Sequence, residues 1–217
     1  MYVPSHFEEP CTEVLHELIL QHPFGTLVTH GAAGLDANHI PFELLPAQGA
    51  LGTLTAHVAR ANPVWQELAG GAEVLVIFRA GDAYISPNWY PSKHEAHKQV
   101  PTWNYMVAHA HGRITIRDDE RYVRGVVARL TRTHEAAQPM PWKMGDSAPE
   151  FIDTLLKAIV GLEIGITRLT GKSKLSQNKE LRDLRAAGEA LQAQGDHAIG
   201  DAMLARADAR QARDGLP

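Results

Sequence analysis

A histidine at the end of a strand-like segment is the first side chain in this sequence that could perform chemistry. In LGTLTAHV (51–58), apolar and polar residues alternate, so a strand would carry Thr53, Thr55 and His57 on one face. An imidazole there could ligate a metal or a heme iron, or donate a hydrogen bond to a flavin. The structural alternative, a histidine bonded to a backbone carbonyl at a strand end, is equally compatible with the residues.

A proline-rich segment further along the chain combines groups that suit a phosphate with groups that suit a flat ring. Residues 87–102 contain three prolines and are typical of a long polar loop, which in a compact domain is often functional. Hydroxyls and a lysine are common phosphate ligands, and aromatic side chains provide a wall for a planar ring. The side chains concerned are Ser86, Asn88, Trp89, Tyr90, Ser92 and Lys93. The alternative is a surface loop whose aromatic residues fold onto the core.

A third set of polar side chains lies in GKSKLSQN (171–178). Strand alternation places Lys172, Lys174 and Ser176 on one face, and Gln177 follows them in the sequence. Two lysines on one edge could bind a phosphate or a carboxylate, and burial would lower a lysine pKa so that the amine could act as a base. The alternative is a solvated edge strand whose lysines protect it from aggregation.

The remaining motifs exclude several enzyme classes. The sequence lacks a GxGxxG turn after a strand, a Walker lysine motif, a GxSxG elbow and an HExxH helix. His109 and His111 share one strand face, but no third metal ligand stands near them in the sequence, so a polar strand face is the better interpretation. The single Cys11 provides neither a disulfide framework nor a cysteine-ligated metal site.

Composition describes an ordinary globular protein of 217 residues, of which 44% are apolar and 21% are charged. The formal net charge of −4 does not favour direct DNA binding, because that binding needs a basic face that displaces counterions. No apolar run is long enough for a transmembrane helix, and the N-terminus does not resemble a signal peptide. We therefore expect a cytoplasmic protein that does not bind membranes.

Hydrophobic periodicity predicts a succession of strands with helices inserted among them. The expected strands are residues 25–31, 36–45, 51–58, 73–78, 82–87, 103–116 and 161–169. The expected helices are residues 12–22, 63–69, 122–130, 147–159 and a tail that runs from 179 to about Arg213. Because helices do not alternate with strands, the pattern indicates an antiparallel β-barrel with peripheral helices, an α+β fold, and not a doubly wound parallel sheet.

The composition changes after Asn178, where alanine, arginine and glutamine begin to dominate. A thin apolar seam of Leu181, Leu184 and Leu191 runs through this part of the chain. We therefore expect a cofactor-binding domain over residues 1–178 and a helical C-terminal tail over residues 179–217.

Six segments of the chain together resemble the PaiB family, which is usually described as FMN-binding negative transcriptional regulators. They are MYVPSHFEEP, GTLVTHGAAGLDANHIPFEL, AHVARANPVW, AYISPNWYPSKHEAHKQVPTWNY, RLTRTHEAAQPMPWKM and KLSQN. The resemblance is collinear and covers roughly residues 1–180. Ser173 departs from the aromatic residue expected there in this family, and the tail after Asn178 is not covered by the resemblance.

The resemblance implies a split β-barrel like that of pyridoxamine-phosphate oxidases and flavin reductases. It also implies a bacterial homodimer that binds FMN where the two subunits meet. Together with the residue patterns above, it gives the following cofactor-binding candidates: His57, Arg60, Asn62, Ser86, Trp89, Tyr90, Ser92, Lys93, Lys172 and Gln177.

PaiB proteins also resemble piperazate synthases, which bind heme b and close an N–N bond in N5-hydroxyornithine. In that case His57, within AHVARANP, is expected to be the axial iron ligand and Lys174 the catalytic base. Four functions therefore stay open: a flavin-binding regulator that contacts DNA indirectly if at all, a heme enzyme of the piperazate-synthase type, an FMN-dependent oxidoreductase, and a domain that has lost its cofactor.

Overall fold

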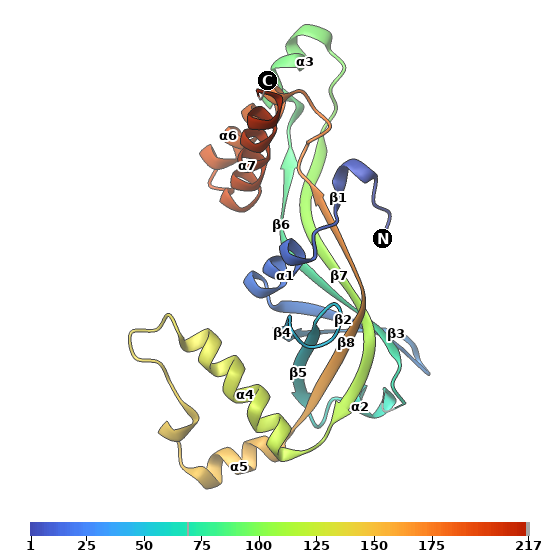
Figure 1. The fold of residues 1–217 in the computed structure, drawn as a ribbon, viewed down its shortest axis with the longest axis vertical. Coiled ribbons are helices and arrows are strands. Elements are labelled where there is room, and N and C mark those ends of the chain that lie inside the picture. Colours follow the sequence, from blue (N-terminus) through green and yellow to red (C-terminus); the bar gives the residue numbers. More distant parts are fainter. Residues whose placement is uncertain (69, 216–217) are drawn as a thin grey trace. The chain divides into compact units, whose positions relative to one another are not determined.

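The computed structural model describes residues 1–68 and 70–215, which form an antiparallel sheet with helices attached (Figure 1). The sheet order is β3-β2-β6-β7-β8-β5-β4, with β1 also paired to β8, and along this path the described strands do not close into a barrel. The antiparallel α+β architecture expected from the sequence is confirmed. The strands are β1 (Glu8–Glu9), β2 (Phe24–Gly31), β3 (Gly34–Pro41), β4 (Glu43–Leu45), β5 (Thr53–Ala59), β6 (Glu73–Ile85), β7 (Thr102–Arg117) and β8 (Ile159–Lys174).

The α-helices lie between the strands and at the C-terminal end of the chain. They are α1 (Thr12–Gln21), α2 (Val64–Glu67), α3 (Pro91–Ala96), α4 (Glu120–Glu135), α5 (Pro149–Lys157), α6 (Leu181–Ala193) and α7 (His197–Asp214). The helix predicted over 63–69 is shorter in the structure, and its last predicted residue, Ala69, lies outside the described residues. None of the helices in the described part is both long enough and apolar enough to cross a membrane.

Three stretches differ from the prediction. The strands predicted at 73–78 and 82–87 are one continuous strand, β6, in which Gly81 has a φ of +137° that an L side chain rarely adopts. The strand predicted at 36–45 is divided into β3 and β4. The loop predicted at 87–102 contains helix α3, which starts at Pro91, a position where the missing proline N–H has no helical partner to lose.

The chain forms two compact units, which we describe separately. Unit 1 comprises Met1–Leu18, Arg79–Ala108 and Thr170–Pro217, and unit 2 comprises Ile19–Phe78 and His109–Leu169. The division at residue 178 that the composition suggests stays a prediction.

Strand β5 organises unit 2. It pairs with β4 on one side and β8 on the other, and its apolar residues Leu54 and Ala56 are fully buried. The opposite, polar face lies against α4. There Thr55 donates a hydrogen bond of 2.9 Å to Glu43, and the Nε of Arg129 from α4 donates to both oxygens of the same carboxylate at 2.8 Å. Thr55, Glu43 and Arg129 are therefore paired with one another on this face, as burial requires.

Helices α6 and α7 form a helical hairpin in unit 1 and lie side by side (Figure 1). They approach closely because Gly188 has no side chain: a Cβ there would lie 3.0 Å from Leu204. The hairpin shares an apolar cluster with β6 and the segments after β6 and β8, so the C-terminal helices are packed onto the rest of this unit. The buried members of the cluster are Ala83, Ile85, Tyr90, Leu175, Leu184, Ala187, Leu191, Ile199, Met203 and Ala207.

Candidate functional site

His57 lines a cavity of about 450 Å³ in unit 2. Its volume falls within the range of about 300–1,000 Å³ that is typical of small-molecule sites. Every other lining side chain among the described residues is apolar. These residues are Ala59, Val127, Trp142, Met144, Ile152, Leu155, Leu156, Ala158 and Ile159. The walls thus come from the end of β5, from α4 and α5, and from the segment that joins the two helices.

The His57 ring is held by strand pairing and carries a buried nitrogen without a partner. Its Cα lies opposite Gly161 of β8, and its Nδ1 has no hydrogen-bond partner among the described residues. Burial lowers the pKa of His57, because the charged imidazolium would lose hydration there. The ring is therefore neutral near pH 7 and can offer a lone pair or an N–H to a ligand. The alternative of a backbone carbonyl as the partner does not apply to Nδ1.

Large apolar side chains are left exposed at this cavity. Trp142 and Leu155, which line it, are 40% and 48% exposed, and Phe151 on the same helix as Leu155 is 57% exposed. A group of exposed apolar side chains beside a cavity is typical of a surface that a ligand or a partner covers.

Arg60 and Asn62, the other predicted ligands in unit 2, are engaged in structural contacts. Arg60 makes a bidentate ion pair with Asp118 at 2.5 and 2.8 Å and donates to the carbonyls of Lys157 and Ile159. This pairing raises the pKa of the Arg60 guanidinium and lowers that of the Asp118 carboxyl. Asn62 accepts a hydrogen bond from the backbone N–H of Val64 at 3.0 Å and donates one to Asn38 at 2.7 Å. A cofactor-binding role for either residue stays a prediction.

The predicted aromatic ligands of unit 1 pack against the helical hairpin. Tyr90 is completely buried in the apolar cluster of α6 and α7, and Trp89 packs against the same cluster. The Tyr90 hydroxyl lies 3.2 Å from the Ser176 hydroxyl, and the Lys179 ammonium lies 5.4 Å from the Tyr90 ring centre. These contacts favour the alternative raised above, in which the aromatic residues of this segment fold onto the core.

The predicted phosphate ligands of the same segment have partners within unit 1. Ser86 caps the short turn at Pro87–Trp89, and Lys93 donates to Asn88 at 2.5 Å. The hydroxyl of Ser92 donates to the fully buried Asp183 at 2.6 Å. A phosphate would have to replace at least one of these contacts, so their role as ligands stays a prediction.

The two lysines at the end of β8 are in contact with aromatic residues or backbone oxygens. Lys172 is buried, donates to the Tyr2 carbonyl at 3.1 Å, and lies 5.3 Å from the Tyr105 ring centre. Lys174 donates to the Thr102 hydroxyl and to the Trp103 carbonyl. Burial is the main reason that the pKa of Lys174 is lowered, with the charge of Lys172 contributing in the same direction.

A cavity of about 210 Å³ in unit 1 is lined by Lys174 together with Asn104 and Ser176. Asn104 and Ser176 are buried, and the Asn104 amide donates to the Ser176 hydroxyl at 2.9 Å. Gln177 does not line this cavity: its amide bridges the backbone of Ser173 and that of Leu175, which fixes the turn after β8. The role of Lys174 as a catalytic base stays a prediction.

The predicted ligands fall into two groups, with His57, Arg60 and Asn62 in unit 2 and the others in unit 1. Sequence reasoning missed the cavity walls, Trp142 and Met144 above all. The signal was present, since Trp142 is a large aromatic residue in a polar, proline-containing segment. No group of three or more His, Cys, Asp or Glu side chains that could hold a bare metal ion occurs within 1–68 and 70–215.

Residues 1–168 match the family described as "Putative FMN-binding domain". The chain is 29% identical over 192 residues to the protease synthase and sporulation protein PAI 2 of Bacillus subtilis, covering 88% of this chain and 89% of that protein. It is 32% identical over 212 residues to an uncharacterized protein of Emericella nidulans, covering 82% of this chain and 84% of the relative. The family resemblance read from the sequence is thereby confirmed.

Solved structures confirm the split-barrel fold. The FAD and heme binding protein from Mycobacterium smegmatis superposes with a TM-score of 0.58 at 18% identity, over 77% of this chain and 73% of that one. A flavocytochrome from Azotobacter vinelandii superposes with a TM-score of 0.56 at 11% identity, over 79% and 72% of the two chains. At these identities the likeness concerns the fold alone.

Proposed function

Because the chain belongs to the family described as "Putative FMN-binding domain", we propose that it binds a flat prosthetic group, FMN, in the cavity lined by His57. The observation that carries the proposal is the buried Nδ1 of His57, which lacks a hydrogen-bond partner among the described residues. An unpaired buried polar atom costs about 1–3 kcal/mol, and a ligand that pairs with it removes this cost.

The cavity suits a ring more than a phosphate. Trp142, Ile152 and Leu155 offer apolar surface for the isoalloxazine, and His57 offers one imidazole nitrogen to a polar edge atom. No lysine or arginine is among the described residues that line it, so the FMN phosphate must find its donors outside this cavity. When bound, FMN supplies the redox chemistry, and the part of this chain is to orient the ring and to exclude water.

Heme b is the second candidate, and it is also favoured by the unpaired Nδ1 of His57. A neutral imidazole is a common axial ligand of heme iron, and the apolar lining without cations suits a macrocycle. His57 would then be the axial ligand. With heme as the group, the function becomes that of an enzyme of the piperazate-synthase type, and Lys174 is the residue of this chain whose lowered pKa suits a base.

A homodimer is part of the proposal. Its support is the exposed apolar surface at the His57 cavity, where Trp142, Phe151 and Leu155 are left without cover within the described chain. A second copy would bury these side chains, as subunit interfaces typically do with aromatic residues. Sedimentation of the purified protein tests this: a monomer that retains its prosthetic group would contradict it.

We also propose that any role in transcriptional regulation is indirect. The support for a regulatory role is family resemblance. The formal net charge of −4 disfavours direct binding to DNA phosphates. Gel-shift assays at low and high salt provide the test. Retardation of DNA at low salt that weakens as salt increases would contradict an indirect role.

The visible spectrum of the protein as purified is the direct test of the prosthetic group. Flavin absorption in the blue supports FMN, and an intense Soret band supports heme. In either case the His57→Ala variant is expected to lose most of the colour, because the unpaired imidazole is the proposed contact. A protein that stays colourless and takes up neither group would overturn the proposal.

The His30→Ala variant is the matched control. His30 is an exposed histidine on β2, in the same unit, and does not line the cavity. Thermal melting of both variants distinguishes loss of the group from loss of the fold. Equal loss of colour in both variants would show that the effect does not arise from the His57 contact.

A further inference from the structure

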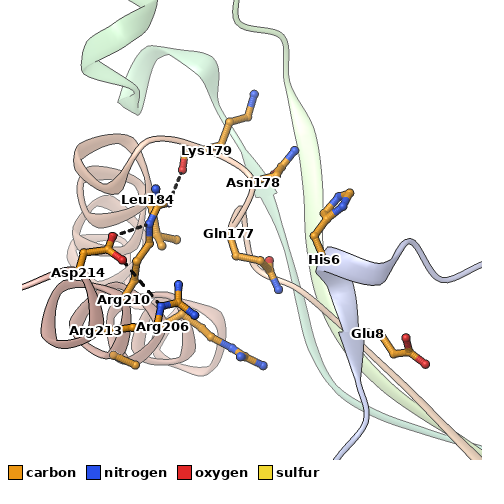
Figure 2. Close-up of a pocket in the computed structure, with 11 residues that line it drawn as sticks. His6, Glu8, Gln177, Asn178, Lys179, Leu184, Arg206, Arg210, Arg213 and Asp214 are labelled. Atoms are coloured by element: carbon orange, nitrogen blue, oxygen red, sulfur yellow. Dashed lines mark hydrogen bonds and ion pairs between the residues drawn. The ribbon is translucent and has the colours of Figure 1, made fainter. Parts of the chain in front are cut away.

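A cavity in unit 1 has the opposite chemistry. It lies in unit 1 against α7, has a volume of about 550 Å³, and is shown in Figure 2. Four cationic side chains line it: Lys179, Arg206, Arg210 and Arg213. Only α7 supplies the arginines, and this helix lies beyond residues 1–168, the part of the chain that matches the flavin-binding family. The arginines of the cavity therefore come from the C-terminal hairpin, while His6 and Glu8 of the family domain complete its lining.

Helical geometry explains why the three arginines meet at one cavity. Positions 206, 210 and 213 are separated by four and three residues, so their side chains share one face of α7. The segment just before α6 joins them through its backbone, because the Lys179 carbonyl accepts a hydrogen bond of 2.7 Å from Arg210, while the Lys179 ammonium donates to Gln99 at 2.6 Å. This hydrogen bond brings the segment before α6 next to α7, although the two are about 30 residues apart in the sequence.

The cations outnumber the carboxylates around the cavity. Among the described lining residues, the four cations face two acidic side chains, those of Glu8 and Asp214. Arg206 is held by Glu9, whose carboxylate lies 2.7 Å from the guanidinium. Arg210 and Arg213 are therefore the two arginines of the cavity whose carboxylate contacts are longer than 3 Å.

The ion pairs between Asp214 and the arginines are long. Its carboxylate oxygens lie 3.4 Å from Arg210 and 3.7 Å from Arg213, which is longer than the roughly 2.7–2.9 Å of a close charge-assisted hydrogen bond. Asp214 is also the last residue of α7, and its side chain is 55% exposed. An exposed ion pair of this kind contributes about 0–1 kcal/mol, so a multiply charged ligand can displace it.

We propose that this cavity binds a small phosphorylated anion through Arg206, Arg210 and Arg213. The planar guanidinium fork matches two oxygens of a phosphate, and several forks on one face favour a ligand with more than one negative charge. The cavity, of about 550 Å³, has room for a molecule of the size of a nucleotide. The site is separate from the His57 cavity in its lining residues, and it does not depend on the nature of the prosthetic group.

Calorimetric titration of the purified full chain with inorganic pyrophosphate tests the proposal. The Arg210→Gln/Arg213→Gln double variant is expected to weaken binding by about tenfold or more, since it removes two guanidinium groups from the ligand. The Arg213→Gln single variant is a second test, because this side chain is 76% exposed and its loss is compatible with folding. Asp214→Asn is expected to tighten binding, because it removes the competing carboxylate.

Arg182→Gln is the matched control. Arg182 belongs to α6 in the same unit and pairs with Glu95 and Glu180, away from the cavity. Pyrophosphate affinity that falls equally in the control, or that is absent in the wild-type protein, overturns the proposal. Loss of the bound prosthetic group in the double variant also overturns it, because the arginines would then serve the phosphate of the flavin.

Discussion

The cavity of unit 2 and the cavity of unit 1 described above are of similar volume and have opposite linings. The cavity of unit 2 has one neutral histidine among apolar walls, and the cavity of unit 1 has three arginines and a lysine. The first can hold a group that is flat and mostly apolar, and the second can hold a group that is small and strongly charged. Lining chemistry, and not volume, thus distinguishes what each cavity can bind.

The two regions also differ in how their apolar residues are used. The hairpin of unit 1 has its leucines buried, with Leu184 fully covered, whereas Leu155 of unit 2 is 48% exposed at the cavity. If Leu155 contacts a ligand and Leu184 stabilises the fold, a substitution of Leu155 will reduce ligand binding and a substitution of Leu184 will reduce the free energy of unfolding. The following predictions test this difference, beginning with the largest effect.

Leu184→Ala is expected to lower the free energy of unfolding by about 2–5 kcal/mol, because it leaves a void in the apolar cluster of α6 and α7. Denaturant unfolding measures this. The amount of prosthetic group bound per folded molecule is expected to stay unchanged. A substitution here that left stability intact would show that the hairpin is not part of the folded core of unit 1.

Acidification is expected to destabilise unit 2 through His57. Burial lowers the pKa of this histidine in the folded state, so the unfolded chain binds the proton more readily as the pH falls below about 6.5. The contribution is fully present above that pH and is lost progressively toward the lowered folded pKa. Each pH unit within this window costs at most about 1.4 kcal/mol.

The His57→Gln variant isolates this contribution, because His109 and His111 also have a pKa lowered by burial. As the pH falls below the ordinary histidine pKa of about 6.5, the free energy of unfolding of the wild type is expected to decrease more than that of the variant. Parallel curves would show that the folded protein does not disfavour protonation of His57.

Leu155→Ala is expected to change stability by less than about 1 kcal/mol, because nearly half of this side chain is exposed in the single chain. The same substitution is expected to reduce the occupancy of the prosthetic group, since it removes part of one wall. Absorbance per mole of protein, compared with the Leu184→Ala variant, measures this effect. Full occupancy in Leu155→Ala would remove this residue from the site.

Local periodicity predicted most of the strands, and longer-range effects explain the exceptions. The strand expected at 103–116 is β7 (Thr102–Arg117), in which burial alternates from Ala108 to Thr115. The continuity of β6 was missed because Arg79, Gly81 and Asp82 are typical of a turn, yet the strand continues through Gly81. Pairing with neighbouring strands overrides this local signal, and pairing is not visible in a single segment.

The candidate site could be predicted only in part. Alternation within 51–58 identified His57 as a polar residue on a strand, which required only local information. Its neighbours Val127, Trp142 and Ile152 are 70 or more positions away in the sequence. The packing of α4 and α5 brings them to the cavity. The partners of Ser92 and Lys174 were likewise hidden, because Asp183 and Thr102 are distant in the sequence.

The central claim is that His57 holds a flat prosthetic group in the apolar cavity of unit 2. Titration of the colourless, stripped full chain with FMN and with hemin, followed by visible absorbance, tests it most directly. We predict saturable binding of one of the two by the wild-type protein and affinity weakened about tenfold or more in His57→Gln. Equal affinity in both proteins, for whichever group binds, would contradict the claim.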